Sequence, residues 1–366
     1  MSLARRNLFQ DKTRLSLSII GVALAVMMIL VLKGFQTGFY RQITAYLDYS
    51  PGSIVVAQED VVNLLGATSL LPEGILQKAE SIRGVDEAIP VVSQFVILDL
   101  HEKKQPAYMI GYEPDFGGGP WELAAGREPS KKWEIVFDRN LADRHDLQLG
   151  DEIEVLEKDF TLVGLSNGTS SWMTSFFFIR KQDAEELLLS PGATSYLLLT
   201  TTTDADLGRI VTRINGFSDV NALTKTEMAA NDIKFLARVF SAPISLMVAI
   251  AFLVGTMIIG LIIYTATVER QREYGVIKAI GAKNLVLYRV VLTQALFASI
   301  TGALFGILLA NGMARWIMTA RPQFLVLIEP ADIRQALLAG LGMAFFAALI
   351  PTRVVARLEP AEVFRK

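Results

Sequence analysis

The sequence predicts an α-helical membrane protein with four transmembrane helices plus a large α+β extracytoplasmic domain. Of its 366 residues, 52% are hydrophobic, which is more than an ordinary soluble domain needs. The apolar residues gather in four runs that are each long enough to cross a bilayer. Between the first and second runs lie about two hundred residues with mixed strand and helix patterns. The chain is therefore expected to be a membrane protein with a water-soluble insert.

The first apolar run covers residues 15–36 and follows a basic segment at 1–14. The segment from Leu3 to Phe9 has the amphipathic, basic pattern of a helix that lies on an anionic inner leaflet. A secretory signal peptide shares this layout, and Ala23-Leu24-Ala25 resembles a cleavage site. That site falls in the middle of the run, and about eighteen helical residues span about 27 Å. We therefore expect an uncleaved transmembrane helix.

Basic residues at the ends of the runs predict the topology, since Lys and Arg near a membrane stay cytoplasmic. They are frequent before the first run, between the second and third, and after the fourth, so both termini are expected in the cytoplasm. The predicted spans are 15–36, 239–267, 287–313 and 334–352. They are joined by an extracytoplasmic domain at 37–238, a cytoplasmic elbow at 268–286 and a short outer loop at 314–333, and a cytoplasmic tail at 353–366 follows. Pro351 can kink the last helix into a cytoplasmic extension.

The extracytoplasmic domain is predicted to contain two split β-α-β halves around a β-rich insert. The first half consists of strands at 53–57 and 93–100 around a helix at 72–83, and the second of strands at 176–179 and 196–200 around a helix at 181–189. A further helix is expected at 204–215 behind an Asp N-cap. The insert, at about 101–170, contains short strands at 108–111, 135–137, 152–156 and 160–165.

The elbow contains an amphipathic pattern. Val276, Ile277 and Ile280 recur at helical spacing on one face, while Arg272, Glu273 and Lys278 lie largely around the other. Gly281 falls where a helix favours a left-handed C-terminal residue. The spacing alone leaves two interpretations open: a helix that docks on a partner, or a solvated linker helix resting on the headgroups.

The same segment, V-E-R-Q-R-E-Y-G-V-I-K-A-I-G-A at 268–282, resembles the E-R-x-x-E-x-G-x-x-K-A-x-G-A segment of the MacB/FtsX-type ABC transporter permeases. In that family the segment is the coupling helix that docks onto a separate ATPase subunit. The resemblance assigns this role to Glu269, Arg270, Arg272, Glu273, Gly275, Val276, Lys278, Ala279 and Gly281. It also implies two ATPase copies that bind ATP and Mg, a second permease subunit forming a homodimer, and a bacterial inner-membrane location. A periplasmic adaptor and an outer-membrane channel are further partners of some family members.

The resemblance extends along nearly the whole chain. The order of Gly111–Pro114, Gly126-Arg127, an Asn140–Ala142 turn into Leu149–Asp151, and Phe160–Gly164 is similar to the MacB-type periplasmic core, a split βαβ porter part with a β-rich inserted lobe. The tail from Pro351 to Arg365 matches the closing P-x-x-x-A-x-x-x-P-x-E-x-x-R of the family. Four features resemble the DevC-like exporters associated with glycolipids instead of the lipoprotein extractors: Asn7-Leu8, Gly118–Trp121, Tyr274 and Val363–Arg365.

Small residues recur in the predicted spans. Gly302 and Gly306 form a G-x-x-x-G pair, Gly21 and Ala25 a looser one, and Gly255 and Gly260 lie in the second span. Such spacing allows close helix contact either within one subunit or across a dimer. The family architecture favours a dimer seam that involves Gly21 and Gly255.

No catalytic constellation is found in the sequence. The two histidines, His101 and His145, lack metal-ligand spacing and are expected on the surface, and there is no cysteine. There is also no G-x-x-x-x-G-K-[ST] motif, so ATP hydrolysis is expected on another polypeptide. We expect a non-catalytic permease subunit that exports a lipid, glycolipid, lipoprotein or other amphiphile. The alternatives are an FtsX-like scaffold that activates a cell-wall enzyme and, less favoured, a bacitracin-type sensor permease, which normally has ten spans.

Overall fold

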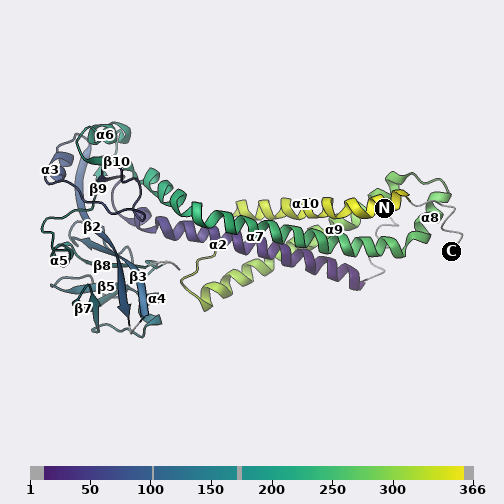
Figure 1. Cartoon of the computed structure of the whole chain (residues 1–366), viewed down its shortest axis with the longest axis horizontal. Helices are drawn as coiled ribbons and strands as arrows, with labels where there is room; N and C mark the ends of the chain where they lie inside the picture. Colours follow the sequence, from purple (N-terminus) through teal and green to yellow (C-terminus); the bar gives the residue numbers. More distant parts are fainter. Residues whose placement is uncertain (1–11, 101–102, 171–174, 358–366) are drawn as a thin grey trace. The chain divides into compact units, whose positions relative to one another are not determined.

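The computed structural model describes residues 12–100, 103–170 and 175–357 (Figure 1). These residues divide into two compact units. The membrane unit contains residues 12–38, 240–321 and 325–357. The outer unit contains residues 39–239 together with 322–324.

The membrane unit is built from four long helices. They are α2 (Lys12–Tyr49), α7 (Lys225–Glu269), α9 (Asn284–Ala320) and α10 (Pro330–Arg357). Within the described ranges, these are the four helices that are long and apolar enough to cross a membrane, as predicted. Pro351 lies inside α10, and the helix continues beyond it to Arg357.

Two of these helices extend well past the predicted spans. Residues 39–49 of α2 and residues 225–239 of α7 belong to the outer unit. Hydropathy does not reveal these extensions because they are amphipathic. Met228, for example, is fully buried in an outer-unit core, whereas Lys234 and Phe235 are exposed.

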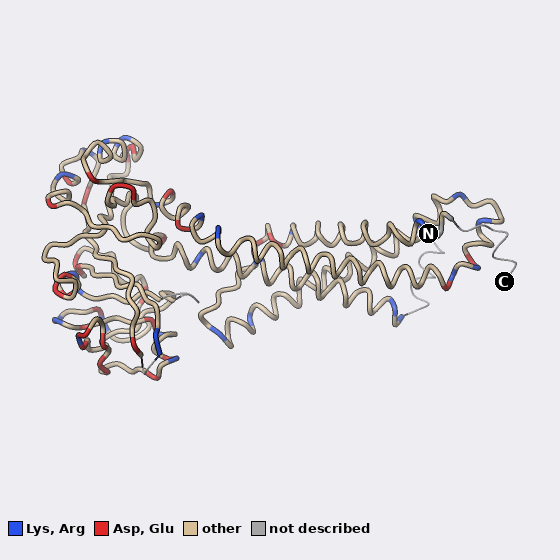
Figure 2. Tube along the Cα trace, in the orientation of Figure 1, with Lys and Arg blue, Asp and Glu red and all other residues tan. Residues whose placement is uncertain are grey.

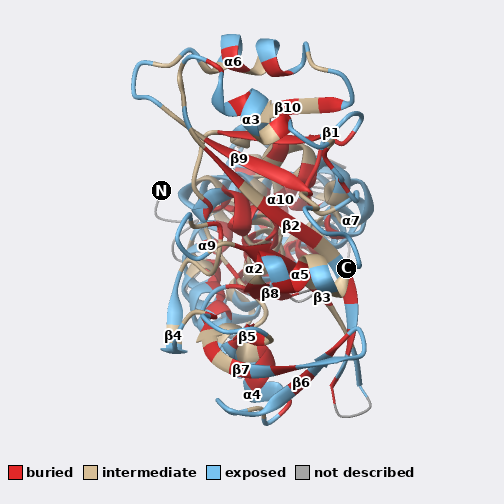
Figure 3. Cartoon of the chain, turned by 90° about the vertical axis from the view of Figure 1, so that its left-hand side faces the viewer, coloured by how far each residue is buried: buried red, intermediate tan, exposed pale blue. Residues whose placement is uncertain are grey.

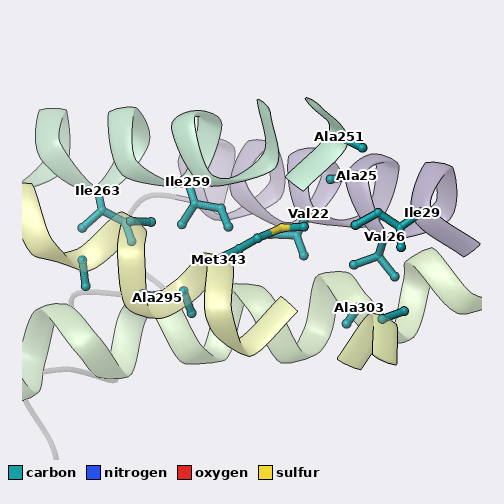
Figure 4. Packing of buried hydrophobic residues seen from close by; sticks show 14 of the residues in the cluster. Val22, Ala25, Val26, Ile29, Ala251, Ile259, Ile263, Ala295, Ala303 and Met343 are labelled. Carbon is teal, nitrogen blue, oxygen red and sulfur yellow. The ribbon is translucent and has the colours of Figure 1, made fainter. Parts of the chain in front are cut away.

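The helices of the membrane unit enclose one apolar core (Figure 4). Val22 and Val26 of α2 are fully buried in it, and Met343 of α10 lies among residues from the other helices. Many of the other members are alanines, which allow the helices to approach closely.

Strands from the beginning and the end of the outer unit together form a four-stranded part, in the order β10–β1–β9–β2. Its elements are β1 (Ile54–Gln58), α3 (Ile75–Glu80), β2 (Val85–Leu100), β9 (Tyr196–Thr201), α6 (Leu207–Ile214) and β10 (Val220–Thr224). Because β9 is antiparallel to both β1 and β2, the strands β1 and β2 are parallel with one strand between them. The same argument applies to β9 and β10, which flank β1. These are two split β-α-β units.

Strand β2 carries the sheet into the inserted lobe. Its first part pairs with β9 and its second part with β3, so one 16-residue strand serves both regions. The lobe contains β3 (Lys103–Tyr112), β4 (Leu123–Gly126), β5 (Glu134–Asp138), α4 (Arg139–Arg144), β6 (Glu152–Val155), β7 (Lys158–Ser166), β8 (Ser175–Arg180) and α5 (Lys181–Leu187). Its strands follow β2 in the order β3–β8–β5–β7–β4, with β6 on β7. Figure 3 shows most strands of the unit as buried, with β4 exposed.

The structure corrects the predicted boundary of the insert. Strand β8 is parallel to β3 and antiparallel to β5, so 176–179 belongs to the lobe and not to a split half. The second half is instead β9–α6–β10, and its last strand was not predicted. Apolar strands of this length look alike whichever sheet they join, because the pairing partner is set by tertiary contacts.

Three local predictions also change. The helix expected at 72–83 is confined to α3, since Gly74 adopts a left-handed conformation (φ 75°) just before it. The Asn140–Ala142 segment lies in α4 and not in a turn, because Asp138 accepts a hydrogen bond from the Leu141 N–H as an N-cap. The N-cap of α6 is Asp206, where the prediction started the helix at Asp204.

Candidate coupling elbow

Helix α8 (Gln271–Ala279) forms the elbow between α7 and α9. Its C-terminal end is closed by two backbone hydrogen bonds. The N–H of Ala282 donates to the carbonyl of Ile277 (3.2 Å), and the N–H of Gly281 donates to that of Lys278 (3.0 Å). This is the Schellman pattern, with Gly281 in the left-handed conformation that the sequence predicted (φ 98°). A Cβ atom at Gly281 would meet nothing within 4 Å, so the backbone conformation and not space favours glycine there.

One side of α8 packs into the membrane unit. Tyr274 is only 2% exposed and belongs to the apolar core of that unit, and Ile277 packs against the same core. Gly275 is buried beside Tyr274. Burial raises the pKa of the Tyr274 hydroxyl, and the nearby charge of Arg270 opposes that shift. The elbow is therefore anchored to the helices that it connects.

The opposite side of α8 is open. We call Arg272, Glu273, Val276, Ala279 and Ile280 the elbow surface, because all five residues are exposed. Val276 is 39% exposed and Ile280 is 81% exposed. The sequence placed Val276, Ile277 and Ile280 on one face, but in the structure Ile277 packs against the core that contains Tyr274, while the other two are exposed. Exposed apolar side chains beside charged ones are typical of a contact surface for a partner.

Three polar contacts lie in the elbow region, and one of them joins α8 itself to another helix. Arg14 of α2 forms an ion pair with Glu269 at the end of α7 (Nη2 to Oε1, 2.5 Å). The Lys278 ammonium donates to the carbonyl of Ala356 near the end of α10 (2.8 Å). Arg270 lies 3.9 Å from Glu273. The elbow region therefore contacts the ends of α2, α7 and α10, although an exposed pair such as Arg14–Glu269 contributes only about 0–1 kcal/mol.

These contacts divide the predicted coupling residues into two groups. Arg272, Glu273, Val276 and Ala279 face outward, and Ile280 joins them although the sequence analysis did not name it as a site residue. The other five, Glu269, Arg270, Gly275, Lys278 and Gly281, instead anchor or position the helix. No local sequence pattern indicates the Arg14–Glu269 or Lys278–Ala356 contacts, because the partners lie 255 and 78 positions apart in the chain. Figure 2 shows charged residues at the ends of the membrane helices and long uncharged stretches between them.

The six small residues singled out in the spans all meet the chain's own helices. An added Cβ at Gly21 would lie 2.5 Å from Ile258, and one at Gly255 would lie 2.7 Å from Ala25. The remaining contacts of this kind are Gly260 with Ala347, Gly302 with Val22 and the Ile19 carbonyl, and Gly306 with Val26 and the Ala23 carbonyl. These positions serve packing within the subunit, and their contacts give no support to a dimer seam at Gly21 and Gly255.

His145 belongs to no metal site among the described residues. His145 is 9% exposed, in contrast to the surface position expected, and it occupies the C-cap of the unpredicted helix α4. His101 lies outside the described residues. Among the residues that the structure describes, no group of three or more His, Asp or Glu side chains could hold a metal ion.

Comparison with known proteins agrees with the two units. The model of the MacB-like periplasmic core domain matches residues 15–218, and that of the FtsX-like permease C-terminal region matches residues 245–360. The chain therefore belongs to the MacB/FtsX-type ABC transporter permeases, and it is a multi-pass membrane protein.

Two curated ABC transporter permeases match this chain over nearly their whole length. An uncharacterized ABC transporter permease of Mycobacterium tuberculosis is 25% identical, over 99% of this chain and 98% of its own. One from Methanocaldococcus jannaschii is 22% identical, over 100% and 97%. The macrolide export ATP-binding/permease protein MacB of Agrobacterium fabrum is 26% identical over 44% of this chain and 25% of its own. Among solved structures, the periplasmic region of MacB from Actinobacillus actinomycetemcomitans overlaps 49% of this chain and 92% of its own, with 11% identity and a TM-score of 0.37.

Proposed function

We propose that this permease transmits the motion of a separate ATPase subunit, through the elbow, to an amphiphile handled by the outer unit. The observation that carries the proposal is the two-sided elbow: Tyr274 is locked into the core of the membrane unit while Val276 and Ile280 stay exposed. A rigid connection on one side and an open apolar surface on the other suit a helix that is pushed by a partner.

In this proposal two ATPase copies, carrying the ATP and Mg, act on a homodimer of the chain in the bacterial inner membrane. Both termini are cytoplasmic, and the cargo is exported, with an adaptor and an outer-membrane channel as further partners. An FtsX-like scaffold would use the same elbow to drive a periplasmic enzyme. The inserted lobe between β2 and β9 favours export, since it gives the outer unit a second region for handling cargo.

The elbow surface is tested by Ile280→Glu, which replaces its most exposed apolar side chain with a charge. We expect ATPase binding to fall about tenfold or more, because a desolvated charge without a partner opposes association. The measurement is pull-down of the ATPase encoded with the permease, followed by ATP hydrolysis in reconstituted membranes. Leu189→Glu is the matched control, since Leu189 is 88% exposed in the outer unit. If both variants bind the ATPase equally well, the elbow is only a solvated linker.

The C-terminal turn is tested separately by Gly281→Val. A β-branched residue at positive φ costs about 1–2 kcal/mol locally, although nothing lies within 4 Å of the new Cβ. Membrane insertion should persist while ATP-dependent activity falls. Gly281→Asn, which tolerates the left-handed conformation, should retain more activity than the valine variant. If valine and asparagine behave alike, the turn plays no part in coupling.

The topology is tested by single cysteines in this cysteine-free chain. An impermeant thiol reagent added to intact cells should label a cysteine at Asn167 in the outer unit but not one at Lys283 beside the elbow. Permeabilised cells provide the control, because both positions should react there. Labelling of the Lys283 position in intact cells would show that the orientation is the opposite one. The elbow could then not contact a cytoplasmic ATPase.

A further inference from the structure

The outer unit contains a cavity of about 290 Å³. Phe39, Gln42, Ile43 and Ala45 of α2 form one wall, and Leu236 of α7 adds to the lining. The remaining walls come from β2, β3, β8 and two loops that contribute Leu65 and residues 168–170. Every lining residue belongs to the outer unit.

The lining is apolar and carries no charged side chain. Phe39, Phe95, Tyr108 and Phe176 supply aromatic surface. The polar groups are already engaged by the protein: the Gln42 amide donates to the carbonyls of Ser170 and Gln323 (both 3.1 Å). The Tyr108 hydroxyl donates to the Leu65 carbonyl, and the Thr169 hydroxyl donates to Asp138 (2.8 Å). A ligand would therefore find van der Waals contact and few free hydrogen-bonding groups.

The volume limits what can enter. A dry apolar cavity of about 150 Å³ holds one benzene molecule, and pockets for whole drug-sized ligands start near about 300 Å³. The cavity therefore suits part of an acyl chain and not a complete lipid. Phe95, which lines the cavity, is 47% exposed, and Ile97 on the same face of β2 is 61% exposed. These side chains give the cavity an apolar approach from the surface.

We propose that this cavity binds the acyl chain of an amphiphile, and that it is the cargo-contacting site of the outer unit. Helices α2 and α7, which line part of the cavity, also connect it to the membrane unit. Phe39 directly follows the last membrane-unit residue of α2, and Leu236 precedes the membrane unit by four residues on α7. A shift of either helix along its axis would change the cavity wall. This inference rests on the proposed function for its role in transport, whereas the binding of an acyl chain can be measured independently.

The test uses the full-length chain in phosphatidylcholine nanodiscs and a diazirine-bearing palmitic acid as the probe. After illumination, we expect saturable labelling of peptides that contain residues 39–45 and 106–108, displaced by excess unlabelled palmitic acid. Labelling of the exposed α7 residues Leu246, Met257 and Leu261 should be neither saturable nor displaced. A diazirine-bearing phospholipid in a parallel arm distinguishes a free fatty acid from a membrane lipid as the source of the chain. Displaceable labelling by either probe supports the site.

A cavity-filling variant sharpens the result. Ala45→Leu places a larger side chain in the wall and should reduce the displaceable labelling about tenfold. Ala237→Leu is the matched control, since Ala237 lies on α7 beside Leu236 but does not line the cavity. Absence of displaceable labelling in the parent protein overturns the inference whatever the variants do. If the parent protein then still binds its ATPase through the elbow, the cavity inference is wrong but the proposed function stands. If the ATPase does not bind at the elbow while the labelling is intact, the proposed function is contradicted instead.

Discussion

The membrane unit and the outer unit select buried side chains of opposite size. The outer unit buries many large aromatic residues completely, including Phe137, Phe177 and Phe178. The membrane unit leaves many large side chains exposed, with Met257 at 72% and Leu308 at 69%, and buries small ones. Its buried small residues include Ala295, Ala303, Ala310, Ala336, Ala344, Gly302 and Gly306.

This difference follows from the two solvents. In water, burying a large apolar side chain removes the most surface from contact with the solvent and gives the largest stabilisation. In lipid, a large side chain gains little by leaving the acyl chains, so helices associate by close packing of small residues. Substitutions of the same chemistry should therefore have very different effects in the two units.

The largest effect is expected for Phe178→Ala in the outer unit. Phe178 is fully buried and makes edge contacts with Tyr112 and Trp121. Truncation leaves a cavity and should destabilise that unit by about 3–5 kcal/mol. Phe305→Ala is the matched change in the membrane unit, where the side chain is 53% exposed. It should have a far smaller effect in thermal unfolding of the full chain in nanodiscs. Similar losses in both variants would contradict the comparison.

The sequence predicted the architecture well where one residue pattern dictates one structure. The four spans follow from uncharged runs, and the turn after α8 follows from Gly281 alone. The strands predicted at 152–156 and 160–165 pair as the β6–β7 hairpin, with Leu156 and Glu157 at positive φ in the turn. In each case the local sequence contains the whole physical reason.

Elements decided by tertiary contacts were predicted less well. Strand β8 was assigned to the wrong sheet, and β10 was missed, because pairing partners leave no mark on a short apolar strand. On the elbow, helical periodicity correctly indicated two faces but placed Ile277 with Val276 and Ile280. Which face is buried depends on Tyr274 meeting the membrane core, and the Lys278–Ala356 contact depends on where α10 ends. Neither can be read from spacing.

The next largest effect is expected at Asp232 of α7, whose carboxylate is buried in the outer unit. One carboxylate oxygen accepts hydrogen bonds from the N–H groups of Leu64 and Leu65 (3.1 and 2.9 Å), and the other has no hydrogen-bond partner among the described residues. Burial raises the pKa of Asp232 to about 6, against an ordinary 3.8, and the two backbone bonds oppose the shift. The folded protein thus holds the proton more tightly than the unfolded chain. Stability from this group is greatest below about pH 4 and falls as pH rises to about 6, by about 3 kcal/mol.

Asp232→Asn should abolish this loss, because an amide cannot ionise and its oxygen can still accept both backbone bonds. Unfolding temperatures of the full chain in nanodiscs, measured between about pH 4 and pH 8, should then vary less than in the parent. Glu227→Gln on the same helix is the control with the opposite sign. Hydrogen bonds from Thr224 lower the pKa of this exposed carboxylate, so its small contribution is lost as pH falls. A parent-like pH profile in the Asp232→Asn protein would show that Asp232 is not the group responsible.

The smallest effect is expected when a single methyl group is added to α9. This change is also the most direct test of packing in the membrane unit. In Gly302→Ala the new Cβ would lie 2.5 Å from the Cβ of Val22 and 2.8 Å from the carbonyl oxygen of Ile19. Backbone and branched side chain cannot easily yield, so α2 and α9 must separate, at a cost of about 1–3 kcal/mol. Gly312→Ala is the matched control on the same helix, since a Cβ there would meet nothing within 4 Å. It should stabilise the helix by up to about 1 kcal/mol, because alanine is the better helix former. Thermal unfolding in nanodiscs should thus shift in opposite directions for the two alanines. If both variants gain stability, close approach at Gly302 is not what holds α2 against α9.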